Sequence, residues 1–206
     1  MVDLGTGDGR AVIERARREP GTLVIGVDAS AAAMAESSRR AARSVSRGGQ
    51  PNAIFVVAAA ERPPEELVGI ADELVITFPW GSLLAGALGL DATAAAGVAA
   101  LIKDGGHARI LASVVDDDRL DLRPVSEEDA STLADRWACH GLTLAEFRPA
   151  TPIEIEASRS SWARRLSAGR RRPVWRIELV NAAGPATTGA DRVPASAPTD
   201  ARTRAR

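Results

Sequence analysis

Three glycines at alternate positions follow an acidic residue near the start of the chain. The segment Asp3–Gly9 reads DLGTGDG, and it comes directly after the apolar residues Met1 and Val2. Glycine lets a backbone approach a ligand closely, and the helix that follows such a turn offers unpaired N–H groups. The segment therefore predicts a strand, a turn and a helix that together cradle a nucleotide-like cofactor.

Two further acidic residues follow predicted strands. Asp28 ends the apolar run 23–27, about 20 residues beyond the turn, where an acid can bind both hydroxyls of a ribose. Ala60 and Glu61 follow the run 53–57; small residues there leave room for an adenine ring, and the acid can accept its amino group. Because parallel strands end at the same edge of a sheet, we expect the turn and both acids to share one crevice.

The spacing of the glycines separates two classes of cofactor. Dinucleotide enzymes use G-x-G-x-x-G, whereas this chain has the form D-x-G-x-G-x-G, which is typical of S-adenosylmethionine-dependent methyltransferases. Two alternatives stay open: a nicotinamide-type site, and a purely structural turn in which Asp3 ends a strand and Asp8 begins a helix. The cofactor-binding residues predicted from these patterns are Asp3, Gly5, Gly7, Asp28, Ala60 and Glu61.

Tryptophan follows the fourth predicted strand and recurs far along the chain. Trp80 lies in the segment 78–82 (FPWGS), and Trp162 lies in the segment 160–166 (SSWARRL). Stacking on an aromatic side chain is worth about 1–3 kcal/mol per base, so two tryptophans on facing loops can sandwich one nucleobase. The alternative is that each tryptophan belongs to the core.

Arginine gathers in the same C-terminal region as Trp162. Such density beside an aromatic residue is expected of a phosphate-binding surface. A second run lies on the predicted helix 30–45, where it forms either a similar surface or a solvated face. The first group is Arg164, Arg165, Arg170, Arg171, Arg172 and Arg176, and the second is Arg39, Arg40, Arg43 and Arg47.

The rest of the chain predicts the scaffold for these residues. Apolar runs alternate with helical stretches, which indicates an α/β fold with a mostly parallel sheet and helices on both faces. We expect one domain over 1–182 and a disordered tail over 183–206, which lacks apolar periodicity. The predicted strands are 2–4, 23–27, 53–57, 73–77, 107–114, 142–147 and 174–180; the helices are 8–18, 30–45, 91–102, 126–140 and 152–166, with turns at 105–106 and 169–172.

The composition is that of a globular domain and argues against a membrane-spanning or disulfide-linked protein. The chain has 206 residues, is 45% hydrophobic and 26% charged, and carries a net charge of −1, as expected of a globular domain. No apolar run reaches the roughly 18 residues that span a membrane. Cys139 is the only cysteine, which excludes an internal disulfide and disfavours a cysteine-based metal site. We therefore expect a cytoplasmic protein without membrane contact or metal, in which His107 and His140 are structural.

Four segments together resemble the aminoglycoside-resistance 16S ribosomal RNA adenine-N1 methyltransferases of the kanamycin–apramycin type. They are 3–9 (DLGTGDG), 61–63 (ERP), 78–84 (FPWGSLL) and 161–166 (SWARRL). The resemblance implies a Rossmann-like class I fold that binds S-adenosylmethionine, acts as a monomer on adenine 1408 in helix 44 of the 30S subunit, and confers aminoglycoside resistance.

The resemblance also assigns roles to residues. Trp80 and Trp162 would stack on the flipped base, Ser82 and Ser160 would line the cofactor and adenine pocket, and an arginine group would hold the RNA backbone. That group is Arg164, Arg165, Arg170 and Arg172. Adenine N1 has an available lone pair, so no general base is needed, and catalysis would depend on base flipping, stacking and alignment.

Two expectations concern the start of the chain and its activity. The family carries a segment before the glycine turn, so the resemblance predicts a truncated first strand that exposes the edges of its neighbours. Two other functions remain as alternatives: a methyltransferase of the same fold that acts on a small metabolite, and an inactive, truncated RNA-binding homologue.

Overall fold

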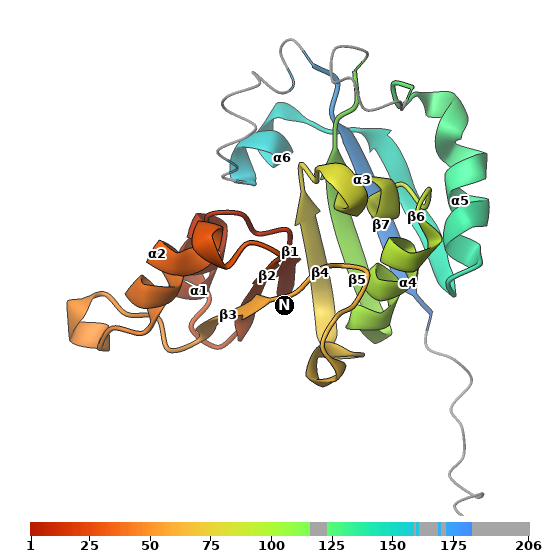
Figure 1. Ribbon diagram of the computed structural model, residues 1–206. Helices are drawn as coiled ribbons and strands as arrows, with labels where there is room; N and C mark the ends of the chain where they lie inside the picture. Colours follow the sequence, from red (N-terminus) through yellow and green to blue (C-terminus); the bar gives the residue numbers. More distant parts are fainter. Residues whose placement is uncertain (116–122, 159, 161–168, 170–171, 183–206) are drawn as a thin grey trace, which may run out of the picture.

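The computed structural model describes residues 1–115, 123–158, 160, 169 and 172–182. Within that part of the chain, seven strands form one sheet in the order β3-β2-β1-β4-β5-β7-β6 (Figure 1). Strands β1 to β5 are parallel, and β7 pairs antiparallel with both β5 and β6. The predicted α/β class with a mostly parallel sheet is confirmed. The strands are β1 (Val2–Leu4), β2 (Val24–Asp28), β3 (Ala53–Val57), β4 (Ala71–Thr77), β5 (Ile102–Ala112), β6 (Leu142–Pro149) and β7 (Trp175–Asn181).

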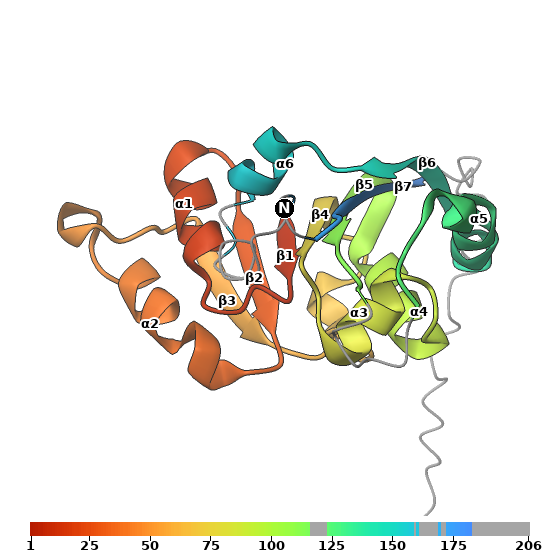
Figure 2. The same ribbon diagram turned by 90° about the horizontal axis from the view of Figure 1, so that it is seen from above.

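Helices cover the sheet from both sides. Helices α1 and α2 pack against β2 and β3, and α5 packs against β6. Figure 2 shows α1 and α6 on one side of the sheet and α3 and α4 on the other. The helices are α1 (Arg10–Arg18), α2 (Ala31–Ala41), α3 (Gly81–Ala87), α4 (Ala92–Leu101), α5 (Ala130–Ala138) and α6 (Pro152–Ala157), with 3-10 turns η1 (Val45–Arg47), η2 (Glu65–Leu67) and η4 (Glu127–Asp129).

The two faces of the strands β4, β5 and β7 differ in chemistry. Side chains alternate between the faces of a strand, and one face carries the buried apolar residues of the main core. The other face carries charged residues that form ion pairs. The apolar set on these strands includes Leu74, Ile76, Ala108, Ile110, Ile177 and Leu179; the charged set on these strands and on β6 is Glu73, Arg109, Glu146, Arg148, Arg176 and Glu178.

Strand β1 lies at the centre of the sheet although it is only three residues long. Val2 and Leu4 are 1% and 2% exposed. All three residues pair with β2, and Val2 and Asp3 pair with β4. The prediction that a short first strand exposes its neighbours' edges is therefore wrong at these positions. Because β1 ends in the glycine turn, this pairing places the turn at the carboxyl edge of the sheet.

Three elements differ from the sequence prediction. The helix expected over 30–45 ends at Ala41, so Arg43 and Arg47 do not continue the helical face that holds Arg39 and Arg40. Helix α3 was not predicted, because glycines and proline around Trp80 are typical of a loop. The turn expected at 105–106 lies inside β5, where the register with β4 shifts and Gly105 has a φ of +75°.

Some predictions fall on residues outside the described ranges. These are most of the helix 152–166 beyond α6 and the tail 183–206. Among the described residues, no single helix has the length and hydropathy to span a membrane, although α3 and α4, bent by 73°, meet these criteria as a pair.

Gly97 of α4 lies against the chain that follows β3. A Cβ atom at Gly97 would come within 1.7 Å of the Ala60 carbonyl oxygen, whereas a Cβ at Gly21 meets no atom within 4 Å. We predict that Gly97→Ala lowers the free energy of unfolding by about 1–3 kcal/mol through this overlap, although alanine normally favours a helix by about 1 kcal/mol. Urea denaturation measures the change. Gly21→Ala is the control, and equal stability of the two variants contradicts the prediction.

Candidate functional site

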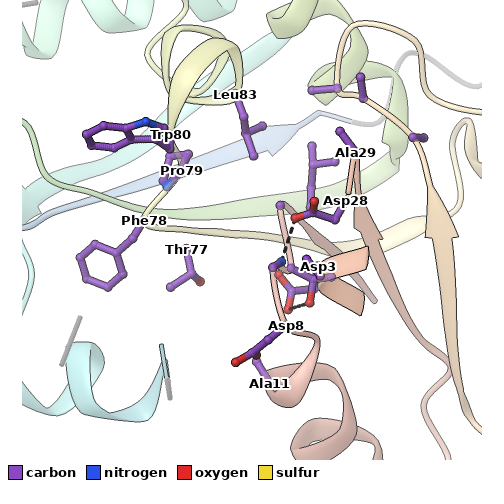
Figure 3. Close-up of a pocket in the computed structure, with 18 of the residues that line it drawn as sticks. Asp3, Asp8, Ala11, Asp28, Ala29, Thr77, Phe78, Pro79, Trp80 and Leu83 are labelled. Atoms are coloured by element: carbon purple, nitrogen blue, oxygen red, sulfur yellow. Dashed lines mark hydrogen bonds between the residues drawn. The ribbon is translucent and has the colours of Figure 1, made fainter. Parts of the chain in front are cut away.

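A cavity of about 680 Å³ opens at the carboxyl ends of β1, β2, β3 and β4. The structure brings together all of the predicted cofactor-binding residues and Trp80 around it. Figure 3 shows Asp3, Asp28 and Trp80 among them. Because four strands end at this edge, residues distant in sequence meet here. The predicted residues in the lining are Asp3, Gly5, Gly7, Asp28, Ala60, Glu61, Trp80, Ser82 and Ser160.

The glycine turn forms the floor of the cavity. Gly5, Gly7 and Gly9 all have positive φ angles, of 75°, 58° and 70°, a backbone region that is open to glycine at little steric cost. A Cβ atom at Gly7 would meet no protein atom within 4 Å, whereas at Gly9 it would lie 2.5 Å from the ring of Phe55. The Gly7 backbone is therefore bare toward the cavity, while Gly9 is packed beneath it.

Asp28 fixes the glycine turn in place. One carboxylate oxygen accepts the Gly7 amide at 2.8 Å, and the other accepts the Ser30 amide at 2.8 Å. Ser30 in turn caps α2, where its hydroxyl accepts the Ala33 amide. Each carboxylate oxygen can accept more than one hydrogen bond, so Asp28 can hold the turn and still accept hydroxyl groups of a ligand.

Asp3 is a buried acid at the base of the same cavity. Its side chain accepts a hydrogen bond from the Thr6 hydroxyl at 3.1 Å, and the residue is 6% exposed. Burial raises the pKa of Asp3 to about 6, the Thr6 hydrogen bond acts against this rise, and the charge of Asp28 adds to it. The ionised form of Asp3 has lost most of its contact with water. It would therefore gain more from a bound cation than an exposed carboxylate would.

Asp8, in contrast, has the contacts of a helix-start acid. Its carboxylate accepts the Arg10 amide and pairs with the Arg10 guanidinium. It lines the outer part of the cavity. The alternative proposed for Asp8 from the sequence agrees with these contacts.

The loop after β4 forms the opposite wall. Phe78 has a φ of +51°, rare for a residue with a side chain, and its amide donates to the Leu111 carbonyl at 2.8 Å. Figure 3 shows Trp80 and Phe78 across the cavity from Asp28. Trp80 is 51% exposed, so the alternative that it belongs to the core is wrong.

The predicted substrate residues are only partly described. Arg172 is described, and its guanidinium donates to the Ser113 hydroxyl at 3.4 Å. The structure thus places Arg172 beside the end of β5. Trp162, Arg164, Arg165 and Arg170 lie outside the described residues.

Several lining residues were missed by sequence reasoning. Thr6 holds Asp3, and Thr77, Leu83 and Ala29 complete the wall. Thr77 ends β4 and Ala29 follows the end of β2. Their position in the sequence, next to Phe78 and Asp28, could therefore have indicated that they line the site. Leu83 has no such signal, because it belongs to the unpredicted helix α3.

The lining suits a ligand that carries positive charge, hydroxyl groups and a flat ring. Among the described residues, the charged side chains that line the cavity are the acids Asp3, Asp8, Asp28 and Glu61 and the arginine Arg10. Ala58, Ala59 and Ala60 follow β3 and line the cavity. Their small side chains leave space for a flat ring. Among residues that the structure describes, no group of three His, Cys, Asp or Glu side chains is arranged to hold a metal ion.

We predict that Asp3→Asn stabilises the protein without ligand above about pH 6 and has no such effect near pH 3. Below the unfolded pKa of 3.8 the carboxyl is protonated in both states. As pH rises from 3.8 to the native pKa of about 6, the wild type loses stability because the native acid resists ionisation, and above that value the loss is complete. Two pKa units correspond to about 3 kcal/mol at most.

Thermal unfolding of both proteins across this pH range measures the difference. Asp8→Asn removes a more exposed acid of the same turn and is expected to change stability by less than about 0.5 kcal/mol. A stability difference between wild type and Asp3→Asn that does not depend on pH refutes the prediction.

Comparison with known proteins gives a consistent picture. A family model described as 16S rRNA (adenine(1408)-N(1))-methyltransferase matches residues 1–181. An enzyme of that name from Streptoalloteichus tenebrarius is 35% identical over 179 residues, covering 84% of this chain and 82% of the relative. One from Escherichia coli is 30% identical over 188 residues, covering 85% and 84%.

Solved structures agree with the sequence matches. A variant of the enzyme from Catenulisporales acidiphilia, solved with the cosubstrate S-adenosylmethionine, aligns with a TM-score of 0.79 and 33% identity, covering 88% of this chain and 84% of that one. The 16S rRNA methyltransferase KamB aligns with a TM-score of 0.76 and 34% identity, covering 87% and 86%. The chain therefore belongs to the 16S rRNA (adenine(1408)-N(1))-methyltransferase family and has the Rossmann-like fold of S-adenosylmethionine-dependent methyltransferases.

Proposed function

We propose that this protein methylates N1 of adenine 1408 in helix 44 of 16S rRNA, on the 30S subunit, and acts as a monomer in the cytoplasm. The observation that carries this proposal is the half-exposed Trp80, which lies across a single cavity from the glycine turn and Asp28. This arrangement offers an aromatic surface for a base on one side and a nucleoside-binding floor on the other.

The floor would hold S-adenosylmethionine through a few contacts. Asp28 would accept the ribose hydroxyls, and Glu61 would accept the adenine amino group beside the small residue Ala60. Gly5 and Gly7 would let the backbone lie close to the ligand, while Asp3 would face its cationic part. The bound cofactor supplies a methyl group on a positively charged sulfur, which is an electrophile for the lone pair of adenine N1.

The side chains of the protein would hold the target base in line with the methyl group of the cofactor. Stacking on Trp80, with Trp162 as the second wall, would replace the stacking that the base loses when it leaves helix 44. Ser82 and Ser160, which line the same cavity, would fix the edge of the base. Adenine N1 needs no deprotonation, so positioning accounts for the catalysis.

Arginines would hold the RNA backbone around the flipped nucleotide. We assign this role to Arg164, Arg165, Arg170 and Arg172, because guanidinium groups bind phosphate oxygens in pairs. Methylation of adenine 1408 adds bulk and positive charge to the decoding site. It would therefore weaken aminoglycoside binding there and make the host resistant to kanamycin and apramycin.

The direct test of this function is methyl transfer to purified 30S subunits, with the modified base located by primer extension. We predict that Trp80→Ala reduces kcat/KM by about 5- to 150-fold, which is the loss of 1–3 kcal/mol of stacking. Trp80→Phe keeps an aromatic surface and is the matched control, expected to retain most of the activity. Equal activity of all three proteins contradicts the role of Trp80.

The same assay separates the alternative functions. Transfer to a small metabolite but not to 30S subunits would refute the rRNA substrate. Binding of 30S subunits without heat of S-adenosylmethionine binding in calorimetry would identify an inactive homologue. Expression in a susceptible bacterium, followed by kanamycin and apramycin challenge, tests the proposed resistance.

A further inference from the structure

Two pairs of like charges lie directly opposite each other on the charged face of the sheet. In the register of β6 and β7, Arg148 faces Arg176 and Glu146 faces Glu178. Like charges at directly opposite positions of neighbouring strands destabilise a sheet. An acid placed between the two arginines offsets this repulsion, and Glu146 of β6 pairs with both of them within the sheet.

Glu154 of helix α6 is a second acid between the same two arginines, and it connects them to the helix. Its carboxylate accepts two hydrogen bonds from Arg148, at 2.7 and 2.9 Å, and one from Arg176 at 3.1 Å. A paired, charge-assisted contact of this kind fixes direction as well as distance. The Arg148 guanidinium holds the pKa of the Glu154 carboxyl well below its usual range, so this contact is ionic at every physiological pH.

The same carboxylate also builds the start of α6. It accepts the Thr151 amide at 2.8 Å and the Thr151 hydroxyl at 2.9 Å, while the Glu154 amide donates back to that hydroxyl. This is a capping box. A helix of six residues is not stable alone, so its place depends on what binds it to the sheet.

Within the described part of the chain, few other contacts fix α6 on the side that faces α1. A second cavity, of about 240 Å³, separates the two helices and is lined by Ala11 and Arg15 of α1 and by Ala157 and Ser158 of α6. Apolar contact comes from Ile155, which forms a small cluster with Leu111 and Val174. The ionic contact of Glu154 is thus a main determinant of how α6 is oriented.

Helix α6 and Ser158 directly after it contact two parts of the lining of the cofactor cavity. Phe78, two residues before Trp80, packs on the cluster that contains Ile155. At the other end of the helix, the Ser160 amide donates to the Ser158 hydroxyl at 3.3 Å, and Ser160 lines the cavity. A shift of α6 would therefore move Phe78, in the loop that carries Trp80, together with the Ser160 backbone.

We propose that Glu154 is a positioning residue: by binding Arg148 and Arg176 it holds α6 so that Phe78 supports Trp80 and Ser160 lines the cofactor cavity. The role in catalysis rests on the methyltransferase function proposed above. Glu154 itself does not touch the base or the reacting methyl group.

The test compares Glu154→Ala, Glu154→Gln and Glu178→Gln with the wild type. Glu178 of β7 pairs with the same Arg176 within the sheet, so its variant removes one acid from the network and leaves the contacts of Glu154 with Arg148 and Arg176 in place. For each protein we would measure S-adenosylmethionine affinity and stoichiometry by calorimetry, and kcat on 30S subunits per cofactor-binding molecule. Circular dichroism and thermal unfolding give the folded fraction.

We expect Glu154→Ala to lower kcat by about ten- to a hundredfold, as a small misplacement does, and to weaken cofactor binding. Glu154→Gln keeps the capping bonds and one carbonyl acceptor, so it should recover part of both. Glu178→Gln should remain within about twofold of the wild type, since an outer ion pair contributes little.

Three results would overturn the proposal. One is wild-type kcat and cofactor affinity in Glu154→Ala; another is an equal loss in Glu178→Gln. The third is a loss of activity that only follows the folded fraction, with normal kcat per cofactor-binding molecule. If the wild type itself fails to methylate 30S subunits, the proposed function fails, and the cofactor affinities of the variants still decide whether Glu154 positions Ser160.

Discussion

The hydrogen bond from the Gly7 amide to the Asp28 carboxylate connects the glycine turn to the neighbouring strand. Three glycines with positive φ angles give the turn its shape, but the same freedom makes the turn expensive to order. Asp28 offsets this by binding Gly7 and Ser30 with its two oxygens. One carboxylate thus sets both the floor of the cavity and the first turn of α2, and the cofactor site depends on β2 keeping its register with the three residues of β1.

The two faces of the sheet stabilise the site through different interactions. On the face that packs α3 and α4, buried apolar residues give a core that resists movement. On the α6 side, the small apolar cluster of Ile155, Leu111 and Val174 is supplemented by ion pairs between arginines and glutamates, which orient a short helix. The cofactor floor is therefore supported by packing, whereas the wall that carries the aromatic surface is oriented from the charged side.

Local patterns predicted the fold and the floor of the site well. Apolar runs located all seven strands, and the acids at their ends, Asp3, Asp28 and Glu61, were found because a parallel sheet gathers strand ends at one edge. Helix α3 was missed because Gly81 and Pro79 are typical of a loop. The four arginines of 39–47 were placed on one helix, yet the helix ends at Ala41.

What the sequence could not provide were the contacts between distant residues. The like-charged pair Arg148 and Arg176 exists only once the register of β6 and β7 is known, and no local pattern specifies a register between strands with charges at several positions. The bond between Gly7 and Asp28 was also missed, because Asp28 was considered only as a ligand-binding acid. The positive φ of Phe78 has no signal in its residue type.

Asp3 has a consequence for how long the protein survives in a cell. A buried, ionised acid makes the protein without ligand less stable than it would be with a neutral side chain at the same position. A cationic ligand that binds only the native state would restore this loss of stability by mass action. Proteases act on the unfolded fraction, so a difference of 1–2 kcal/mol changes abundance by roughly severalfold. A cationic cofactor bound beside Asp3 would therefore lower the unfolded fraction on which proteases act.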